Sequence, residues 1–225
     1  MSANLKYPQF HDSVAVIGLR RFGSAVAESL MHLGHEVLGI DEDAARVQLW
    51  SDRLTRVAQA DSTNVDALRQ LGLSELAHAI VGIGGNIEAN VLTVLALQEI
   101  GVKDIWARAI SDKHETILKR LGVQNVINLE ATMGERVAHL VTGKMIDFIE
   151  FDDGFAIVKT RAPQEAIGKT LAQSALRAKY GVTIVGVKSP KTDFTYARPE
   201  TSVNLGDLLI VSGETRAVER FASIT

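Results

Sequence analysis

Short apolar runs alternate with longer stretches of mixed polarity along the first 130 residues of the chain. The first run, Val14–Ile17 (VAVI), is apolar throughout, which is typical of a strand covered on both faces. The longer stretches end in leucine or isoleucine followed by a glycine, at Gly34, Gly72, Gly101 and Gly122. A glycine in the left-handed conformation commonly follows the last turn of a helix. The pattern therefore predicts strands that alternate with helices, each helix ending just before its glycine.

This alternation is typical of a parallel sheet. We expect strands over Val14–Ile17, Glu36–Ile40, Arg56–Gln59, Ala79–Ile83, Asp104–Ala109 and Asn125–Asn128. We expect helices over Phe22–Leu33, Ala44–Trp50, Asn64–Leu71, Ile87–Ile100 and Asp112–Leu121. Strands joined through helices of this length form right-handed crossovers, so the fold class is α/β, a Rossmann-type doubly wound sheet.

The pattern changes after Met133. A connecting helix is predicted over Gly134–Met145, and Asp152–Gly154 is an Asp-Gly hairpin signal. The remaining strands and helices are expected over Phe148–Phe151, Phe155–Thr160, Leu171–Lys179, Thr183–Lys188, Leu208–Ser212 and Thr215–Ala222. We therefore predict an N-terminal domain over residues 12–145, which includes the connecting helix, and a small α+β domain over residues 146–225.

Composition narrows the classes of protein. Of the 225 residues, 46% are hydrophobic, and 24 Lys and Arg face 27 Asp and Glu, a net charge of −3. The chain has no basic excess, so we expect no nucleic-acid partner. It has no cysteine, which excludes disulfides, thiolate metal sites and a cysteine nucleophile. The polar segment Met1–Asp12 does not resemble a signal peptide, and no apolar run approaches the ~20 residues of a membrane helix. We expect a cytoplasmic chain that does not insert into the membrane itself.

The first strand leads into Gly18–Gly23 (GLRRFG), the position of the dinucleotide-binding fingerprint G-x-G-x-x-G. Gly18 allows the tight turn, Gly23 allows close packing of helix and strand, and the helix N-terminus offers free N–H groups to a phosphate. Arg20 stands where the fingerprint has its middle glycine. Its long side chain either blocks the approach of a pyrophosphate or swings out and adds positive charge. The loop residues Gly18, Arg20, Arg21, Phe22 and Gly23 are the predicted phosphate-binding segment.

Further candidates lie at the carboxyl ends of the other strands, where open α/β sheets bind ligands. Asp41 ends the second strand, the place of a carboxylate that binds ribose hydroxyls and disfavours a 2′-phosphate. The other candidates are Asp61, Ser62, Gly82, Gly84, Asn86, Arg108 and Glu130. For Asp61 and Ser62 the alternative is a simple helix N-cap. For Gly84 and the adjacent Gly85 the alternative is a plain turn between strand and helix.

The residues do not favour an enzyme. The six histidines are scattered, without metal-binding spacing, and the chain has neither a G-x-S-x-G elbow nor a G-x-x-x-x-G-K-[ST] phosphate loop. The second domain carries no evident acid–base pair. We therefore expect binding without catalysis. An NAD-dependent oxidoreductase remains an alternative, because such an enzyme would have the same fingerprint and the same carboxylate at Asp41. A second alternative is a scaffold subunit that binds no nucleotide because Arg20 closes its cleft.

Several segments, in order, resemble the RCK (KTN) regulatory subunits of Ktr/Trk potassium uptake systems. The resemblance to the N-terminal RCK domain rests on Val14–Glu28, Gly39–Asp41, Ile83–Asn90, Ile105–Arg108 and Val126–Glu130. The resemblance to the C-terminal RCK domain rests on Leu176–Lys188 and Gly206–Gly213. It covers nearly the whole chain, and the two-part layout is more specific than any single motif. Arg20 departs from the family pattern, which has glycine there.

The resemblance implies a gating subunit. Such proteins form homodimers that assemble into an octameric ring beneath a membrane potassium-translocating subunit, at the inner face of the cell membrane. ATP or ADP, and in some members NAD or NADH, binds in the N-terminal cleft, and ATP favours the conducting state.

The resemblance also implies roles for individual residues. The adenosine end would rest on Asp41, Asp61 and Ser62, in a cleft that is lined by Gly82, Gly84 and Asn86. Arg21 would reach the terminal phosphate, partly across the dimer interface, and Arg108 would also contact phosphate. Glu130 matches an acidic residue that helps hold a cation near the γ-phosphate. Arg177 matches an arginine that binds cyclic di-AMP in some relatives, but Leu171 and Ala172 replace the usual isoleucine pair.

Overall fold

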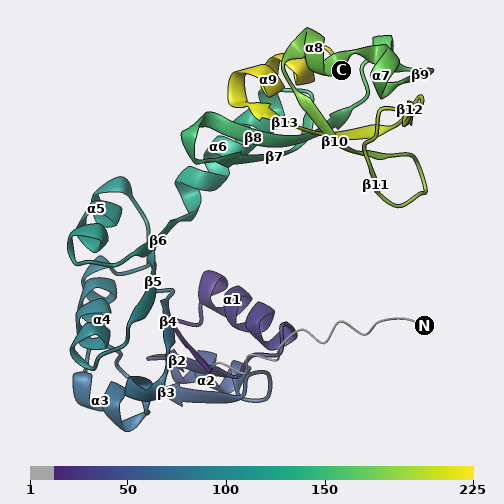
Figure 1. Ribbon diagram of the computed structural model, residues 1–225. Helices are drawn as coiled ribbons and strands as arrows, with labels where there is room; N and C mark the ends of the chain where they lie inside the picture. Colours follow the sequence, from purple (N-terminus) through teal and green to yellow (C-terminus); the bar gives the residue numbers. More distant parts are fainter. Residues whose placement is uncertain (1–12) are drawn as a thin grey trace. The chain divides into compact units, whose positions relative to one another are not determined.

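The computed structural model describes residues 13–225, apart from the side chain of Asp152 (Figure 1). The segment Met1–Asp12, and with it the expected start of the first domain at residue 12, lies outside the described residues. The chain divides into two compact units, one ending at Glu130 and one spanning Ala131–Thr225. None of the described helices is both long and apolar enough to span a membrane.

The first unit is built on a six-stranded parallel sheet in the order β3-β2-β1-β4-β5-β6. The strands are β1 (Val14–Ile17), β2 (Val37–Asp41), β3 (Arg56–Gln59), β4 (His78–Val81), β5 (Asp104–Ala109) and β6 (Asn125–Asn128). All five neighbouring pairs are parallel, so the predicted Rossmann-type sheet is confirmed. The strand order reverses between β1 and β4, and such a switch point is where doubly wound sheets bind ligands.

Helices cover both faces of this sheet. Figure 1 shows α1 (Arg21–His32) and α2 (Ala44–Trp50) on one side, and α3 (Val65–Gln70), α4 (Ile87–Glu99) and α5 (Asp112–Arg120) on the other; a short 3-10 turn, η1 (Leu73–Glu75), precedes β4. Gly34, Gly72, Gly101 and Gly122 follow α1, α3, α4 and α5 with φ between +81° and +89°, as predicted. Two buried clusters fill the two interfaces, one around Leu68, Leu97 and Leu118 and one around Ala27 and Trp50.

The second unit is an antiparallel sheet in the order β11-β10-β13-β8-β7 with helices packed on it. The strands are β7 (Met145–Phe151), β8 (Phe155–Arg161), β10 (Thr183–Lys188), β11 (Thr195–Tyr196) and β13 (Leu208–Glu214). The short strands β9 (Lys169–Thr170) and β12 (Ser202–Val203) form a separate pair. The turns η2 (Asp152–Gly154) and η3 (Gln164–Ala166) complete this unit with the helices α6 (Leu129–Thr142), α7 (Leu171–Ser174), α8 (Leu176–Tyr180) and α9 (Thr215–Ser223).

Helix α6 differs from the expected connecting helix over Gly134–Met145. It begins five residues earlier and ends at Thr142, and Met145 starts β7 instead. Nearly all of α6 belongs to the second unit, whereas we placed the domain boundary at Met145. The reason lies in the contacts of this helix: the ring of His139 stacks on Phe148 of β7 at a centroid distance of 4.1 Å, and Arg136 pairs with Asp147.

The helix expected over Leu171–Lys179 is broken into α7 and α8. Ala175 between them has φ +50°, in the left-handed region. Thr170 starts α7 with a capping box, in which its hydroxyl accepts from the Gln173 N–H and its own N–H donates to the Gln173 side chain. After the break Leu176 enters the core of the second unit, where it is 2% exposed.

Candidate functional site

A cleft opens at the carboxyl ends of β1 to β4. Its lining residues are Ile17, Gly18, Arg20, Ile40, Asp41, Glu42, Arg46, Ala60, Asp61, Ser62, Thr63, Gly82, Ile83, Gly84, Gly85, Asn86 and Ala89. The structure thus brings together eight of the predicted residues, namely Gly18, Arg20, Asp41, Asp61, Ser62, Gly82, Gly84 and Asn86. These residues lie at or just after the ends of four different strands, and the parallel sheet places those strand ends at one edge.

Three glycines pack the first loop against the sheet. A Cβ added to Gly23 would lie 1.9 Å from the carbonyl oxygen of Gly18, so no larger residue fits the first turn of α1. Gly18 has φ +89° and donates its N–H to the Ile40 carbonyl at 2.7 Å. A Cβ on Gly82 would come within 3.2 Å of the Gly23 Cα. This close approach keeps the start of α1 directly beside the end of β4.

Arg20 is the residue that precedes α1. It has extended φ and ψ angles, and its side chain makes no capping hydrogen bond, so the first N–H groups of α1 have no side-chain partner at this position. Its guanidinium reaches the opposite side of the cleft, since a Cβ built on Gly85 would lie 3.6 Å from Nη1 of Arg20. Arg20 forms no ion pair within the described residues. The cleft therefore combines a helix N-terminus with a cation that has no carboxylate partner.

Asp41 lies at the base of the cleft, 6% exposed. Its carboxylate accepts from the Leu19 N–H at 2.7 Å and the Asp43 N–H at 3.0 Å, and it pairs with Arg46 at 2.9 Å. Burial raises the pKa of Asp41, but Arg46 and the two amides outweigh burial and lower the pKa below its ordinary value. Asp41 is therefore ionised at neutral pH.

Arg46, on α2, is a site residue that the sequence reasoning missed. Its guanidinium also pairs with Asp43 at 2.8 Å, so two carboxylates neutralise it. Asp43 is the N-cap of α2, and its side chain accepts from the N–H of Ala45. The signal available in the sequence is the spacing of Asp43 and Arg46, which places the two on one face of a helical turn.

Asp61 and Ser62 follow β3. Asp61 accepts from the backbone N–H and the hydroxyl of Thr63, and these bonds lower the pKa of its carboxyl. The hydroxyl of Ser62 is buried and shares a hydrogen bond of 2.8 Å with Thr93 on α4. The N-cap of α3 is Asn64, so neither Asp61 nor Ser62 has the helix-capping role that we held as an alternative.

Asn86 and Gly84 belong to the loop between β4 and α4. Asn86 is the N-cap of α4, and its side chain accepts from the Ala89 N–H at 3.1 Å. A Cβ on Gly84 would lie 2.7 Å from the Arg108 guanidinium, so a larger residue at this position would displace the end of that side chain.

Arg108 and Glu130 form an ion pair beside the cleft. Nη2 of Arg108 lies 2.6 Å from Oε1 of Glu130, and the guanidinium carbon lies 5.8 Å from the Phe22 ring centroid. Nε of Arg108 is buried without a hydrogen-bond partner. A hydrogen bond to the backbone of Glu130 and the contact with Arg108 both lower the pKa of the Glu130 carboxyl. Phe22, Arg108 and Glu130 do not line the cleft, and neither do the predicted residues Arg21 and Gly23.

The three residues considered for cyclic di-AMP lie in the second unit. Leu171 opens α7 and is half-buried, and Ala172 beside it is exposed. Arg177 lies on α8 and is exposed. Leu171 and Ala172 lie on α7, before the break at Ala175, and Arg177 lies on α8, after it.

Both units match known families. Residues 14–129 match the TrkA-N domain family and residues 155–225 match the TrkA-C domain family. Two curated relatives from Bacillus subtilis are similar over 208 residues, which is 92% of this chain and 94% of theirs. The Ktr system potassium uptake protein C is 35% identical, and the Ktr system potassium uptake protein A is 32% identical.

A solved structure of similar fold is the GsuK channel bound to NAD. It is 16% identical and superposes with a TM-score of 0.66 over 94% of this chain and 39% of its own length. This likeness supports the fold, and the family follows from the domain matches and from the curated relatives. The chain therefore belongs to the Ktr and Trk potassium uptake proteins that join a TrkA-N domain to a TrkA-C domain.

Proposed function

We propose that the chain is a cytosolic, nucleotide-sensing regulatory subunit that gates a membrane potassium transporter. The observation that carries the proposal is the cleft of the first unit, which joins a helix N-terminus, the unpaired Arg20 and the ionised Asp41. Anions bind at helix N-termini, and carboxylates after the second strand bind ribose. The relatives named as potassium uptake proteins support a role of this chain in potassium transport.

The polarity of the cleft orients the nucleotide. The adenosine end lies over Asp41, Asp61 and Ser62, and the phosphates lie at Arg20 and the start of α1. An ionised carboxylate has about four acceptor positions, and three of those on Asp41 are used by Leu19, Asp43 and Arg46. One position is left for a ribose hydroxyl. Since Arg46 is already neutralised by two carboxylates, it offers little to a 2′-phosphate, which favours ATP, ADP or NAD over NADP.

The pair of Arg108 and Glu130 is the part of the site that responds to the terminal phosphate. A γ-phosphate near Arg108 competes with Glu130 for the guanidinium, and the released carboxylate then holds a cation beside that phosphate. The side chain of Glu130 is 57% exposed, so it is accessible to such a cation. ADP lacks the competing group. A ligand that prefers one conformation shifts the equilibrium toward it, typically by about 1–3 kcal/mol per effector.

Exposed apolar side chains support assembly into a homodimer and then an octameric ring. Met133, Val137 and Val141 recur every fourth residue on α6, and none of the residues of this helix is buried within the chain. Leu92 and Leu95 of α4 are also exposed. An apolar stripe along a helix is typical of a surface that a partner covers.

Two alternatives differ in measurable ways. NAD as the ligand is favoured by the NAD-bound GsuK channel, and an oxidoreductase would in addition transfer hydride to a substrate. A scaffold subunit would bind no nucleotide. In this proposal cyclic di-AMP is a second ligand, which binds to the second unit at Arg177.

The test is calorimetry of the full chain with ATP, ADP, NADH and cyclic di-AMP, followed by potassium uptake in cells that also express the membrane subunit. We expect binding of ATP and ADP, different uptake in the two states, and no hydride transfer. Arg21→Ala is expected to weaken ATP more than ADP, because in the proposed homodimer Arg21, which does not line the cleft of its own chain, reaches the terminal phosphate partly across the dimer interface. Equal uptake with both nucleotides would refute the gating proposal, and equal losses in Arg21→Ala would refute the role of Arg21.

A further inference from the structure

We propose a zinc site in the second unit, formed by Glu135 and His139 of α6 and Glu150 of β7. One ligand atom from each of these side chains lies within 4.8 Å of the other two. Glu135 and His139 are four residues apart, so they share one face of the helix. Zinc binds nitrogen and oxygen ligands at roughly 2.0–2.2 Å, so the three side chains have to close in on the ion when it binds.

His139 is held in the way that metal-binding histidines are held. Its Nδ1 lies 3.0 Å from Oε1 of Glu219 on α9, and its ring stacks on Phe148. When Nδ1 carries the proton and donates it to Glu219, the lone pair is on Nε2. A carboxylate that orients the imidazole in this manner is a regular outer partner of zinc sites, because it sets the tautomer and makes the ligand more basic.

Helix α9 also orients the second ligand. The hydroxyl of Thr215 donates to Oε1 of Glu150 at 2.8 Å. Thr215 and Glu219 are four residues apart on α9, so one face of this helix supports both Glu150 and His139 from outside the cluster. Two ligands with outer hydrogen-bond partners from a third element are a stronger indication of a metal site than exposed carboxylates alone.

The donor set selects the metal. One imidazole and two carboxylates suit zinc, whereas magnesium and calcium prefer oxygen ligands throughout. The neighbouring cation Arg136 is engaged by Asp147. Three protein ligands leave a position for water. A bound ion would tie α6 to β7, and α6 is the helix that connects the two units in the sequence.

The test is calorimetry of the full chain, freed of metal, with zinc chloride and with magnesium chloride in the absence of nucleotide. We expect one zinc ion per chain and much weaker magnesium binding. His139→Ala should abolish the zinc isotherm, and Glu135→Gln should weaken it. Glu219→Gln should raise the Kd about 10–100-fold, because outer partners typically contribute this much. The chain has no cysteine, so thiolates contribute nothing to these isotherms.

His32→Ala is the matched control, because His32 is an exposed histidine at the end of α1 whose Nδ1 lies 2.9 Å from the Glu28 carbonyl oxygen, away from the proposed ligands. It should bind zinc like the unchanged chain. Circular dichroism without metal establishes that each variant is folded, and zinc should raise the unfolding temperature of the unchanged chain but not of His139→Ala. The proposal is overturned if the unchanged chain binds no zinc, or if His139→Ala and Glu135→Gln bind it as well as the unchanged chain.

Discussion

Arg20 decides between the two open interpretations of the phosphate loop, and Arg20→Gly restores the residue of the fingerprint. In the structure Arg20 forms no ion pair within the described residues, and its guanidinium lies beside Gly85 across the cleft. If the side chain obstructs the cleft, Arg20→Gly will tighten nucleotide binding. If it binds phosphate, as we propose, Arg20→Gly will weaken binding.

The size of the effect follows from the setting of the residue. A hydrogen bond to a charged group contributes about 1.5–3 kcal/mol. Arg20 is exposed, so the lower value applies, and about 1.4 kcal/mol corresponds to a tenfold change in Kd. Glycine in the position before a helix costs only a few tenths of a kcal/mol in helix stability. We therefore expect the Kd for ATP to rise about tenfold in Arg20→Gly, with little change in folding.

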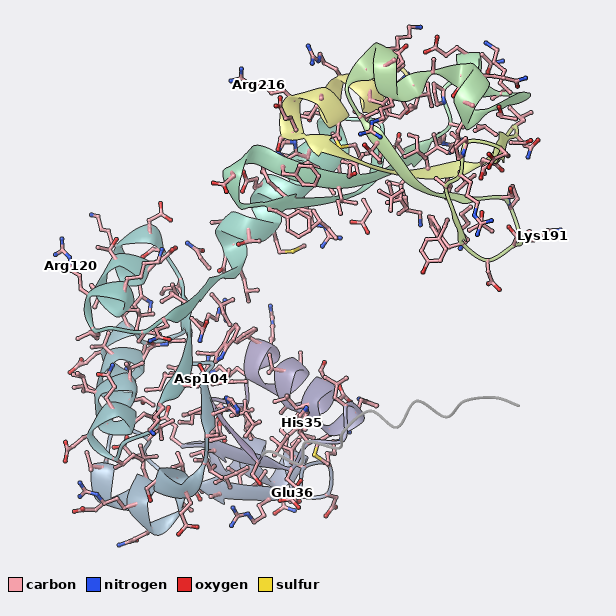
Figure 2. All side chains as sticks on the ribbon, viewed as in Figure 1. His35, Glu36, Asp104, Arg120, Lys191 and Arg216 are labelled. Carbon is pink, nitrogen blue, oxygen red and sulfur yellow. The ribbon has the colours of Figure 1, made fainter. Side chains whose placement is uncertain are left out.

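The assay is calorimetry with ATP and with adenosine, at two salt concentrations. The loss should be present with ATP, smaller at high salt, and absent with adenosine, because only the phosphates contact Arg20. Arg120→Ala is the matched control: Arg120 ends α5, outside the cleft, and its side chain points into solvent (Figure 2). An unchanged or lower Kd for ATP in Arg20→Gly would refute the phosphate-binding role.

Three further predictions concern stability and local strain. Arg46→Met leaves the buried Asp41 carboxylate without its cation, which should cost about 3 kcal/mol of unfolding free energy at pH 7. The lowered pKa of Asp41 gives stability that is present above the unfolded pKa and lost as the pH falls through the folded pKa. Without Arg46 the pKa of Asp41 is lowered less, so acid unfolding should begin at a higher pH, and an unchanged acid midpoint would contradict this. Gly23→Ala places a Cβ 1.9 Å from the Gly18 carbonyl oxygen and should destabilise the chain by about 1–3 kcal/mol or more and abolish ATP binding; a variant with unchanged unfolding temperature would argue against it. Ala175→Gly should stabilise the second unit by up to about 1 kcal/mol in urea unfolding, because glycine accepts the φ of +50° without strain, and a lower urea midpoint would refute the explanation.

The fold of the first unit was predictable because each of its signals is local. The run Val14–Ile17 and glycines such as Gly34 and Gly72 report strand ends and helix ends within a few residues, and the structure agrees within about two residues at most boundaries. Parallel order then follows from the right-handed crossover. None of these steps requires knowledge of distant contacts.

The second unit was less predictable because its boundaries depend on distant contacts. The place of α6 with this unit depends on β7, through the stack of His139 on Phe148 and the pairing of Arg136 with Asp147. The left-handed Ala175 has no sequence signal, since alanine favours a continuous helix. Tertiary packing overrides local preference at both places.

In the candidate site, too, the residues set by local sequence were predictable and those that depend on distant contacts were not. Gly18 and Asp41 were predictable because a single strand sets the place of each, β1 for Gly18 and β2 for Asp41. Arg46 was missed because its part in the cleft depends on the residue that lies opposite it, the Asp41 carboxylate at the end of β2. The same reasoning applies to Arg108, which the sequence assigns to phosphate and the structure pairs with Glu130. If that pair opens when ATP binds, the phosphate contact of Arg108 belongs to the ATP-bound protein. The ion pair with Glu130 then belongs to the protein without nucleotide, and ATP has to break it.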